Sequence, residues 1–244
     1  MALSTALAHD PAFEVASVRS QAKALRLDAT DALRLSPELA ELVPGGCLRP
    51  GGSVGISAGV GHTSLLFRLI SEPIARGAWA AIMGLPNINA HAAAECGVSL
   101  ERLAFIPEPG GSWLEVTAAL LDAVDLVIVN PPRVCRPTDA RRLLARARQR
   151  HSVLILTDGS VPHSRVAATR QLWPEPPDLV FTPTRSQWRG LEHGHGCLTA
   201  GAITVTASGR RINGPARSGR LDLGQRQSAH QQKLPPFTTS GVGE

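Results

Sequence analysis

The sequence contains few of the residue types that usually mark a binding or catalytic site. It has no Tyr, aromatic residues make up 4% of the chain, and no apolar run approaches the ~18 residues that a membrane span needs. So few aromatic side chains give little support to single-strand nucleic-acid binding by base stacking. The first residues also lack the basic start of a secretory signal, so we expect a mature, cytoplasmic protein without a membrane partner.

Cysteine is scarce too, and its spacing excludes a disulfide framework. No Cys-x-x-Cys pair occurs, and the four thiols are scattered through the chain: Cys47, Cys96, Cys135 and Cys197. Such spacing favours reduced core cysteines. His193, His195 and Cys197 would share one face of a strand, but the glycines between them favour a turn and no second ligand pair is evident. We therefore expect no metal site.

What the chain does contain is an alternation of short apolar runs and helical patterns. Strands are predicted at 54–57, 79–83, 103–106, 125–129 and 153–156, with helices at 63–71, 89–96, 112–123, 138–150 and 164–172. Three short strand signals follow, at 179–181, 187–189 and 202–206. This order predicts an α/β fold: a mainly parallel twisted sheet flanked by helices, with an antiparallel C-terminal edge extension.

The flanks of this core differ from it in composition. Residues 1–45 carry a helical pattern and are predicted to form an N-terminal helical lead-in to a core at 46–207. From residue 208 to 244, six basic side chains stand against two acidic ones, a net charge of +4 out of the chain's +5, and apolar residues are few. We expect this segment to be a basic, disordered tail, because it buries too little surface to offset its ordering entropy. A basic tail favours an acidic partner such as nucleic acid.

The most informative stretch is the glycine-bearing turn between the first strand and the first helix of this core. Its residues Gly59, Gly61, His62, Thr63 and Ser64 have the local shape of a phosphate-cradling loop, in which backbone N–H groups face an anion. The usual pattern places Lys before the Ser or Thr. Here His62 occupies that position. Any strand–turn–helix unit with a glycine turn remains an alternative interpretation.

Two acidic groups that an ATPase of this kind needs are also missing. The buried strand at 125–129 is followed by Asn130, where an Asp would hold Mg²⁺, and Leu85 lies near the position expected for the carboxylate that orients water. An amide brings no negative charge to a metal shell. We therefore predict a degenerate P-loop without hydrolytic activity and without a required cofactor, and we keep weak nucleotide or anion binding as an alternative.

Several segments together resemble one family. They are Leu39-Ala-Glu-Leu-Val-Pro-Gly-Gly46, Gly61-His-Thr-Ser-Leu65, Ile82-Met-Gly-Leu-Pro86, Ala94-Glu-Cys-Gly-Val-Ser-Leu-Glu-Arg-Leu103, Asn130-Pro-Pro-Arg-Val-Cys-Arg-Pro-Thr-Asp-Ala-Arg-Arg142 and Arg185-Ser-Gln-Trp-Arg-Gly-Leu-Glu-His-Gly-His-Gly196. In order and pattern the chain resembles RecA-type ATPases, and within them the ImuA-type accessory proteins of bacterial mutagenesis cassettes. It is most similar to the branch with a degenerate nucleotide site.

This resemblance implies a function that composition and periodicity do not show. It implies a non-catalytic RecA-like accessory factor in DNA-damage-induced mutagenesis, within the SOS response and translesion synthesis. Its partners would be a Y-family polymerase-like protein and an error-prone replicative-type polymerase. The alternatives are a RecA-type ATPase that tolerates His62 and a DNA-binding repair protein.

Two sets of residues are candidates for partner surfaces. The helix at 138–150 carries Arg141, Arg142, Arg146, Arg148 and Arg150. A solvated helix face is the simpler interpretation, and a phosphate-contacting DNA surface is the alternative. Apolar side chains in the hairpin and the tail are candidate anchors for the polymerase-like partner: Trp188, Leu221, Leu223, Leu234 and Phe237.

Overall fold

The fold is built on one eight-stranded sheet. The computed structural model describes residues 33–131, 134–157, 173–192, 195–212 and 214–225. The strand order in the sheet is β10-β9-β8-β3-β7-β6-β4-β5. The strands are β3 (Ser53–Ile56), β4 (Ala80–Met83), β5 (Leu103–Ile106), β6 (Leu126–Val129), β7 (Val153–Thr157), β8 (Leu179–Glu192), β9 (His195–Ser208) and β10 (Arg217–Gln225). The predicted architecture, a mainly parallel sheet flanked by helices with an antiparallel edge, is confirmed by this topology.

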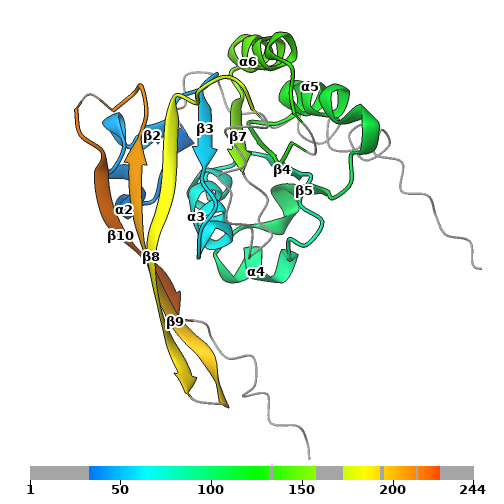
Figure 1. Ribbon diagram of the computed structural model, residues 1–244. Helices are drawn as coiled ribbons and strands as arrows, with labels where there is room; N and C mark the ends of the chain where they lie inside the picture. Colours follow the sequence, from blue (N-terminus) through cyan, green and yellow to red (C-terminus); the bar gives the residue numbers. More distant parts are fainter. Residues whose placement is uncertain (1–32, 132–133, 158–172, 193–194, 213, 226–244) are drawn as a thin grey trace, which may run out of the picture.

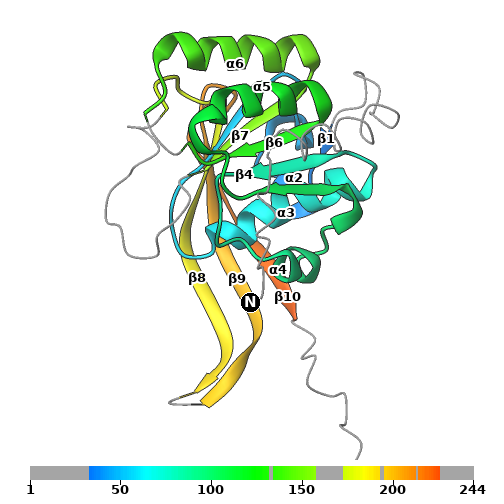
Figure 2. The same ribbon diagram turned by 90° about the vertical axis from the view of Figure 1, so that its right-hand side faces the viewer.

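The parallel half, β3 to β7, is covered by helices on both faces. The helices are α2 (Pro37–Ala40), α3 (His62–Ala75), α4 (Ala90–Glu95), α5 (Trp113–Ala123) and α6 (Pro137–Arg150), with 3-10 turns at Pro44–Gly46, Leu100–Arg102 and Gly110–Ser112. Helices α2, α3 and α4 pack on one face, and α5 and α6 on the other (Figures 1 and 2). Burial on both faces explains why β4, β6 and β7 have continuous apolar runs.

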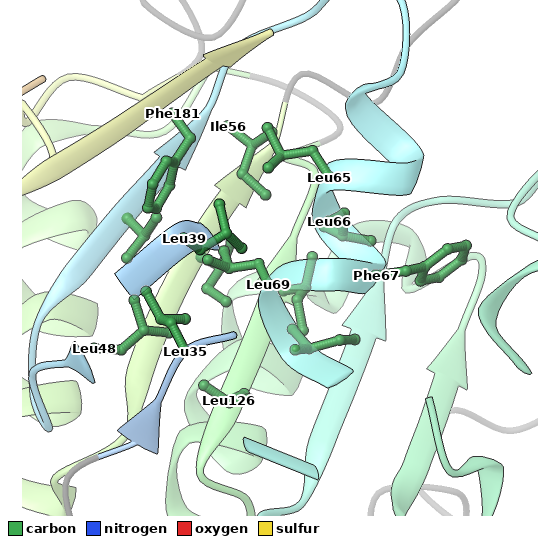
Figure 3. Packing of buried hydrophobic residues seen from close by; sticks show 14 of the residues in the cluster. Leu35, Leu39, Leu48, Ile56, Leu65, Leu66, Phe67, Leu69, Leu126 and Phe181 are labelled. Carbon is green, nitrogen blue, oxygen red and sulfur yellow. The ribbon is translucent and has the colours of Figure 1, made fainter. Parts of the chain in front are cut away.

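The core under α3 joins the two halves of the sheet. Leu65, Leu66 and Leu69 of α3 lie against Leu39 of α2 and against strand residues (Figure 3). Phe181 of β8 belongs to the same cluster, as do Ile203 of β9 and Leu221 of β10. The antiparallel edge is therefore part of the folded core. A small sheet of β1 (Leu33–Arg34) and β2 (Cys47–Leu48) closes this side.

The antiparallel edge differs from the prediction in length and extent. The short strand signals belong to two long strands, β8 and β9, which form a hairpin that extends beyond the rest of the molecule (Figures 1 and 2). The prediction of a disordered tail from residue 208 is wrong for β10, which pairs antiparallel with β9. Residues 226–244 lie outside the described part of the chain.

The N-terminal lead-in is only partly helical where the structure describes it. Residues 1–32 lie outside the described part, Leu33 and Arg34 pair with β2, and only α2 is helical. The predicted helix at 164–172 also falls outside the described residues. Within the described ranges, no helix combines the length and apolar character needed to cross a bilayer.

Candidate functional site

The loop between β3 and α3 has the expected strand–turn–helix shape. Gly61 caps α3 with a φ of 88°, a left-handed conformation that favours glycine. The His62 N–H donates to the Gly59 carbonyl at 3.2 Å, and the Leu65 N–H donates to the Gly61 carbonyl at 2.9 Å. Between them, the N–H groups of Thr63 and Ser64 face the N-terminal end of α3. These two groups could contact an anion, because the first turn of a helix has no internal acceptors for them.

The two glycines of this loop also have a purely internal role. A Cβ atom on Gly61 would lie 2.6 Å from Ile203 Cγ2, and one on Gly59 would lie 2.9 Å from Pro183 Cγ. The loop is therefore packed against β8 and β9 so closely that any side chain at either position would collide. This close packing explains both glycines without a bound phosphate.

His62 does not supply the positive charge of the missing lysine. Burial lowers the pKa of its imidazole below the usual range, while a hydrogen bond with the Gly59 backbone acts in the opposite direction. The ring is therefore neutral at pH 7. The His62 Nε2 atom also lies 3.3 Å from Thr63 Oγ1, so the hydroxyl that would bind Mg²⁺ in a working site contacts the ring instead.

Asn130 has a structural role at the carboxyl ends of β4 and β6. Its Nδ2 donates to the Gly84 carbonyl at 2.9 Å, and its backbone N–H donates to the Met83 carbonyl at 3.0 Å. Leu85, which follows Gly84, packs against the α2–α4 side of the core. At the two positions where an ATPase needs carboxylates, Asn130 therefore hydrogen-bonds to the backbone and Leu85 packs against the core.

Thr157 was not singled out from the sequence. It ends β7, is buried, and is aligned with Ile56 of β3, so it lies beside the strand that enters the loop. Its Oγ1 has no hydrogen-bond partner among the described residues. A polar residue that ends the apolar run at 153–156 was the available signal.

The arginines of α6 divide into two groups. Arg146 forms a bidentate pair with Asp122 at 2.8 and 2.6 Å, Arg150 contacts the same carboxylate at 3.0 Å, and Arg141 contacts Glu175 at 2.8 Å. Arg142 and Arg148 are exposed and have no ion-pair partner within the described ranges. Three of the five predicted DNA contacts are therefore already paired with carboxylates, and a DNA role for this helix stays a prediction.

The candidate partner anchors are placed differently from the prediction. Leu221 is 1% exposed and belongs to the core, so it is not an isolated anchor in a flexible tail. Leu223 is partly buried against the same cluster. The ring of half-buried Trp188 covers Gly201 on β9. Leu234 and Phe237 lie outside the described residues, as does His193 of the histidine pair.

Comparisons with known proteins place the parallel half in a family. Residues 41–163 match the family model of the MT3502 N-terminal domain, which covers half of the chain. The chain belongs to this family. An uncharacterized protein of Mycobacterium tuberculosis, Rv3395c, is 44% identical over 122 residues, which is 49% of this chain and 58% of the relative. The chain thus spans under two thirds of the length of this curated relative.

A solved structure is similar in fold only. The KaiC-like protein PH0186 of Pyrococcus horikoshii has a TM-score of 0.49 and 14% sequence identity, covering 79% of this chain and 98% of that one. At this level of similarity it carries no information about activity. The family match ends at residue 163, so β8, β9 and β10 lie beyond it.

Proposed function

We propose that this protein is a non-catalytic RecA-like accessory factor in DNA-damage-induced mutagenesis and translesion synthesis. It would act through protein contacts with a Y-family polymerase-like protein and an error-prone replicative-type polymerase. The observation that supports the non-catalytic part is the packing of the β3–α3 loop, whose two glycines lie directly against Pro183 and Ile203. The mutagenesis part is supported by the sequence segments that resemble ImuA-type proteins.

Three features support the absence of hydrolysis. The neutral His62 provides no fixed positive charge for the β- and γ-phosphates. The Asn130 amide is held by Gly84 and offers no negative charge to Mg²⁺. Leu85 has no proton-accepting group for a water molecule. His62, Asn130 and Leu85 each make contacts within the fold. Restoring the usual ATPase residue at one of these positions alone would therefore not restore a working site.

A second candidate function is a nucleotide-binding repair protein of the RecA type. The N–H groups of Thr63 and Ser64 at the end of a 14-residue helix favour it, because a helix N-terminus attracts phosphate. This alternative predicts saturable binding of ATP. The non-catalytic proposal allows only weak binding without turnover.

The first experiment measures turnover by the purified full chain with radiolabelled ATP and Mg²⁺. We expect phosphate release at background for the wild type and for Thr63→Ala alike. Release above background that disappears in Thr63→Ala, while the thermal unfolding transition is unchanged, would favour the ATPase. Ser64→Ala serves as the neighbouring control, since it removes a hydroxyl from the same helical turn.

The second experiment tests the cellular role. Affinity capture of the full chain from DNA-damaged cells should recover a Y-family polymerase-like protein, and deletion of the chain should lower damage-induced mutation frequency. Thr63→Ala should restore that frequency as well as the wild type does. Unchanged mutation frequency in the deletion strain would reject the mutagenesis role even if hydrolysis is absent.

A further inference from the structure

One face of the antiparallel edge carries accessible side chains in the part of the chain that the structure describes. On β9, Ile203, Val205 and Ala207 point into the core, so the alternate residues point away from it. The register extends this second face across β8 and β10. We call it the outer face and define it by six residues: Arg185, Gln187, Thr204, Thr206, Ser218 and Arg220.

Positive charge gathers on the outer face and along the same side of the hairpin. Arg185, Arg220 and, further along β8, Arg189 are all exposed. Within the described ranges none of the three has a carboxylate at ion-pair distance, in contrast to Arg141, Arg146 and Arg150 of α6. Asp222, aligned with Ala202, is the one acidic residue among the positions of β10 that are aligned with β9.

The arrangement of these arginines favours an extended anion. Arg185 and Arg220 are both aligned with Thr204, from opposite sides, so their backbones lie roughly 10 Å apart across two strand spacings. Arg189 lies roughly 13 Å from Arg185 along β8. Arg220 Nη1 donates to Gln187 Oε1 at 2.9 Å, which orients the guanidinium. An extended anion could contact all three guanidinium groups at this spacing.

The remaining side chains indicate which anion. The hydroxyls of Thr204, Thr206 and Ser218 and the amide of Gln187 belong to the groups that contact phosphate oxygens. The outer face holds none of the large apolar side chains that form the centre of protein–protein interfaces. It also has no platform for base stacking, because Trp188 covers Gly201 on the opposite face.

We propose that the outer face, with Arg189, binds the phosphodiester backbone of duplex DNA without sequence preference. This inference does not depend on the proposed partners or on the absence of hydrolysis. It assigns DNA contact to the antiparallel edge, where the three arginines have no carboxylate partner among the described residues, and not to α6, where most of the arginines are paired.

The experiment uses the full chain and a short fluorescent duplex of arbitrary sequence, with anisotropy measured between about 50 and 200 mM salt. The double variant Arg185→Gln/Arg220→Gln should bind more weakly at every salt concentration. Its log–log salt dependence should be shallower by about 2, since each lost phosphate contact removes about 0.9 from the slope. Arg185→Lys/Arg220→Lys should retain most of the slope, because the charge remains.

A charge-matched control separates this surface from net charge. Arg34→Gln/Arg49→Gln removes two exposed arginines from the β1–β3 region and should leave affinity and slope close to wild type. Arg189→Gln on the hairpin provides a second probe in case the double variant unfolds, and it should reduce the slope by about 1. Thermal unfolding verifies that each variant is folded.

Four outcomes would overturn the proposal. The first two are equal losses of DNA affinity in the control and test variants, and absence of binding at about 50 mM salt, where phosphate contacts are strongest. The other two are tighter binding to a single strand than to the duplex, and competition by polyglutamate at the same charge concentration as DNA. The last outcome would instead indicate an acidic protein partner.

Discussion

The parallel half of the sheet and its antiparallel edge differ in how many faces of their strands are buried. Every residue of β4 and β6 is buried, because helices cover both faces. On β9 from Ile203 to Ser208, and around Leu221 on β10, buried and more accessible residues alternate, because α2 and α3 pack on one face. The first region is a closed scaffold around the β3–α3 loop, in which His62 occupies the position of the usual lysine. The second offers a polar surface to solvent.

Truncation should show the largest effect, because β10 belongs to the core. A chain ending at Ser208 loses β10, and with it the buried Leu221 and the contact of Gly219 with Leu42. We expect the free energy of unfolding to fall by more than the ~2–5 kcal/mol that deleting one buried Leu side chain costs. Urea unfolding measures it.

The matched control for this truncation is a chain ending at Gln225, which retains the whole of β10. We expect its unfolding transition to stay close to that of the full chain. If both truncated chains unfold at the same urea concentration, β10 contributes nothing to the core, and the contrast between the two truncation sites disappears.

Gly61 joins the two regions, and its substitution should have the second largest effect. Gly61→Ala places a methyl group 2.6 Å from Ile203 Cγ2 at a φ of 88°. Overpacking costs about 1–3 kcal/mol and the left-handed conformation about 1–2 kcal/mol more. Thermal unfolding should therefore show a loss of about 2–5 kcal/mol.

Gly97→Ala is the control for backbone strain alone. Gly97 has a similar φ of 82°, and a Cβ there would meet nothing within 4 Å. We expect it to lose only the conformational part, about 1–2 kcal/mol. Equal losses at the two positions would mean that the loop is not tightly packed on β9. Adding Ile203→Ala, which removes the Cγ2 atom, should lower the cost of Gly61→Ala but not the cost of Gly97→Ala.

The smallest expected effect concerns the helix layer of the parallel half. The Asp122 side chain is 7% exposed, and its pKa is held below the usual value chiefly by hydrogen bonds from Arg146. A lowered pKa in the folded state stabilises the fold above the ordinary value of 3.8, and this contribution is lost as pH falls through the folded pKa. Asp122→Asn should therefore cost about 1 kcal/mol at neutral pH.

The pH dependence supplies the check on Asp122. The difference in stability between wild type and Asp122→Asn should shrink as pH is lowered below about 4. Glu175→Gln, which removes the exposed pair with Arg141, should change stability by no more than about 0.5 kcal/mol at any pH. A difference for Asp122→Asn that is constant down to acid pH would show that the ion pairs do not stabilise α5 against α6.

The sequence predicted the parallel half well and the edge poorly, for one physical reason. A strand buried on both faces is a continuous apolar run, as at 126–129, and is recognised without knowledge of its neighbours. A strand buried on one face needs few apolar residues. In β10 these are Leu221 and Leu223, and Gly219 makes room for Leu42, so the segment resembles a polar tail.

In the candidate site, too, features set by local sequence could be predicted, and features set by contacts between distant segments could not. The loop, His62 and Asn130 were found because their spacing from predicted strands is local. The reason for the glycines was not visible, since Pro183 and Ile203 approach the loop from more than a hundred residues away in the chain. The pairing of Arg146 with Asp122 likewise depends on the packing of two helices, which no local pattern specifies.

The position of β3 in the sheet has a consequence for synthesis. Its neighbours are β7 and β8, and Ser53 hydrogen-bonds to Asp178, 125 residues later in the chain. At about 5–20 residues per second, the ribosome needs roughly 6–25 s to deliver that partner. Until β7 (Val153–Thr157) has been synthesised, β3 has neither of its neighbours, and β8 follows later still. We expect the nascent chain to need a chaperone at this stage, and slowing translation between residues 60 and 180 to increase aggregation of the newly made protein.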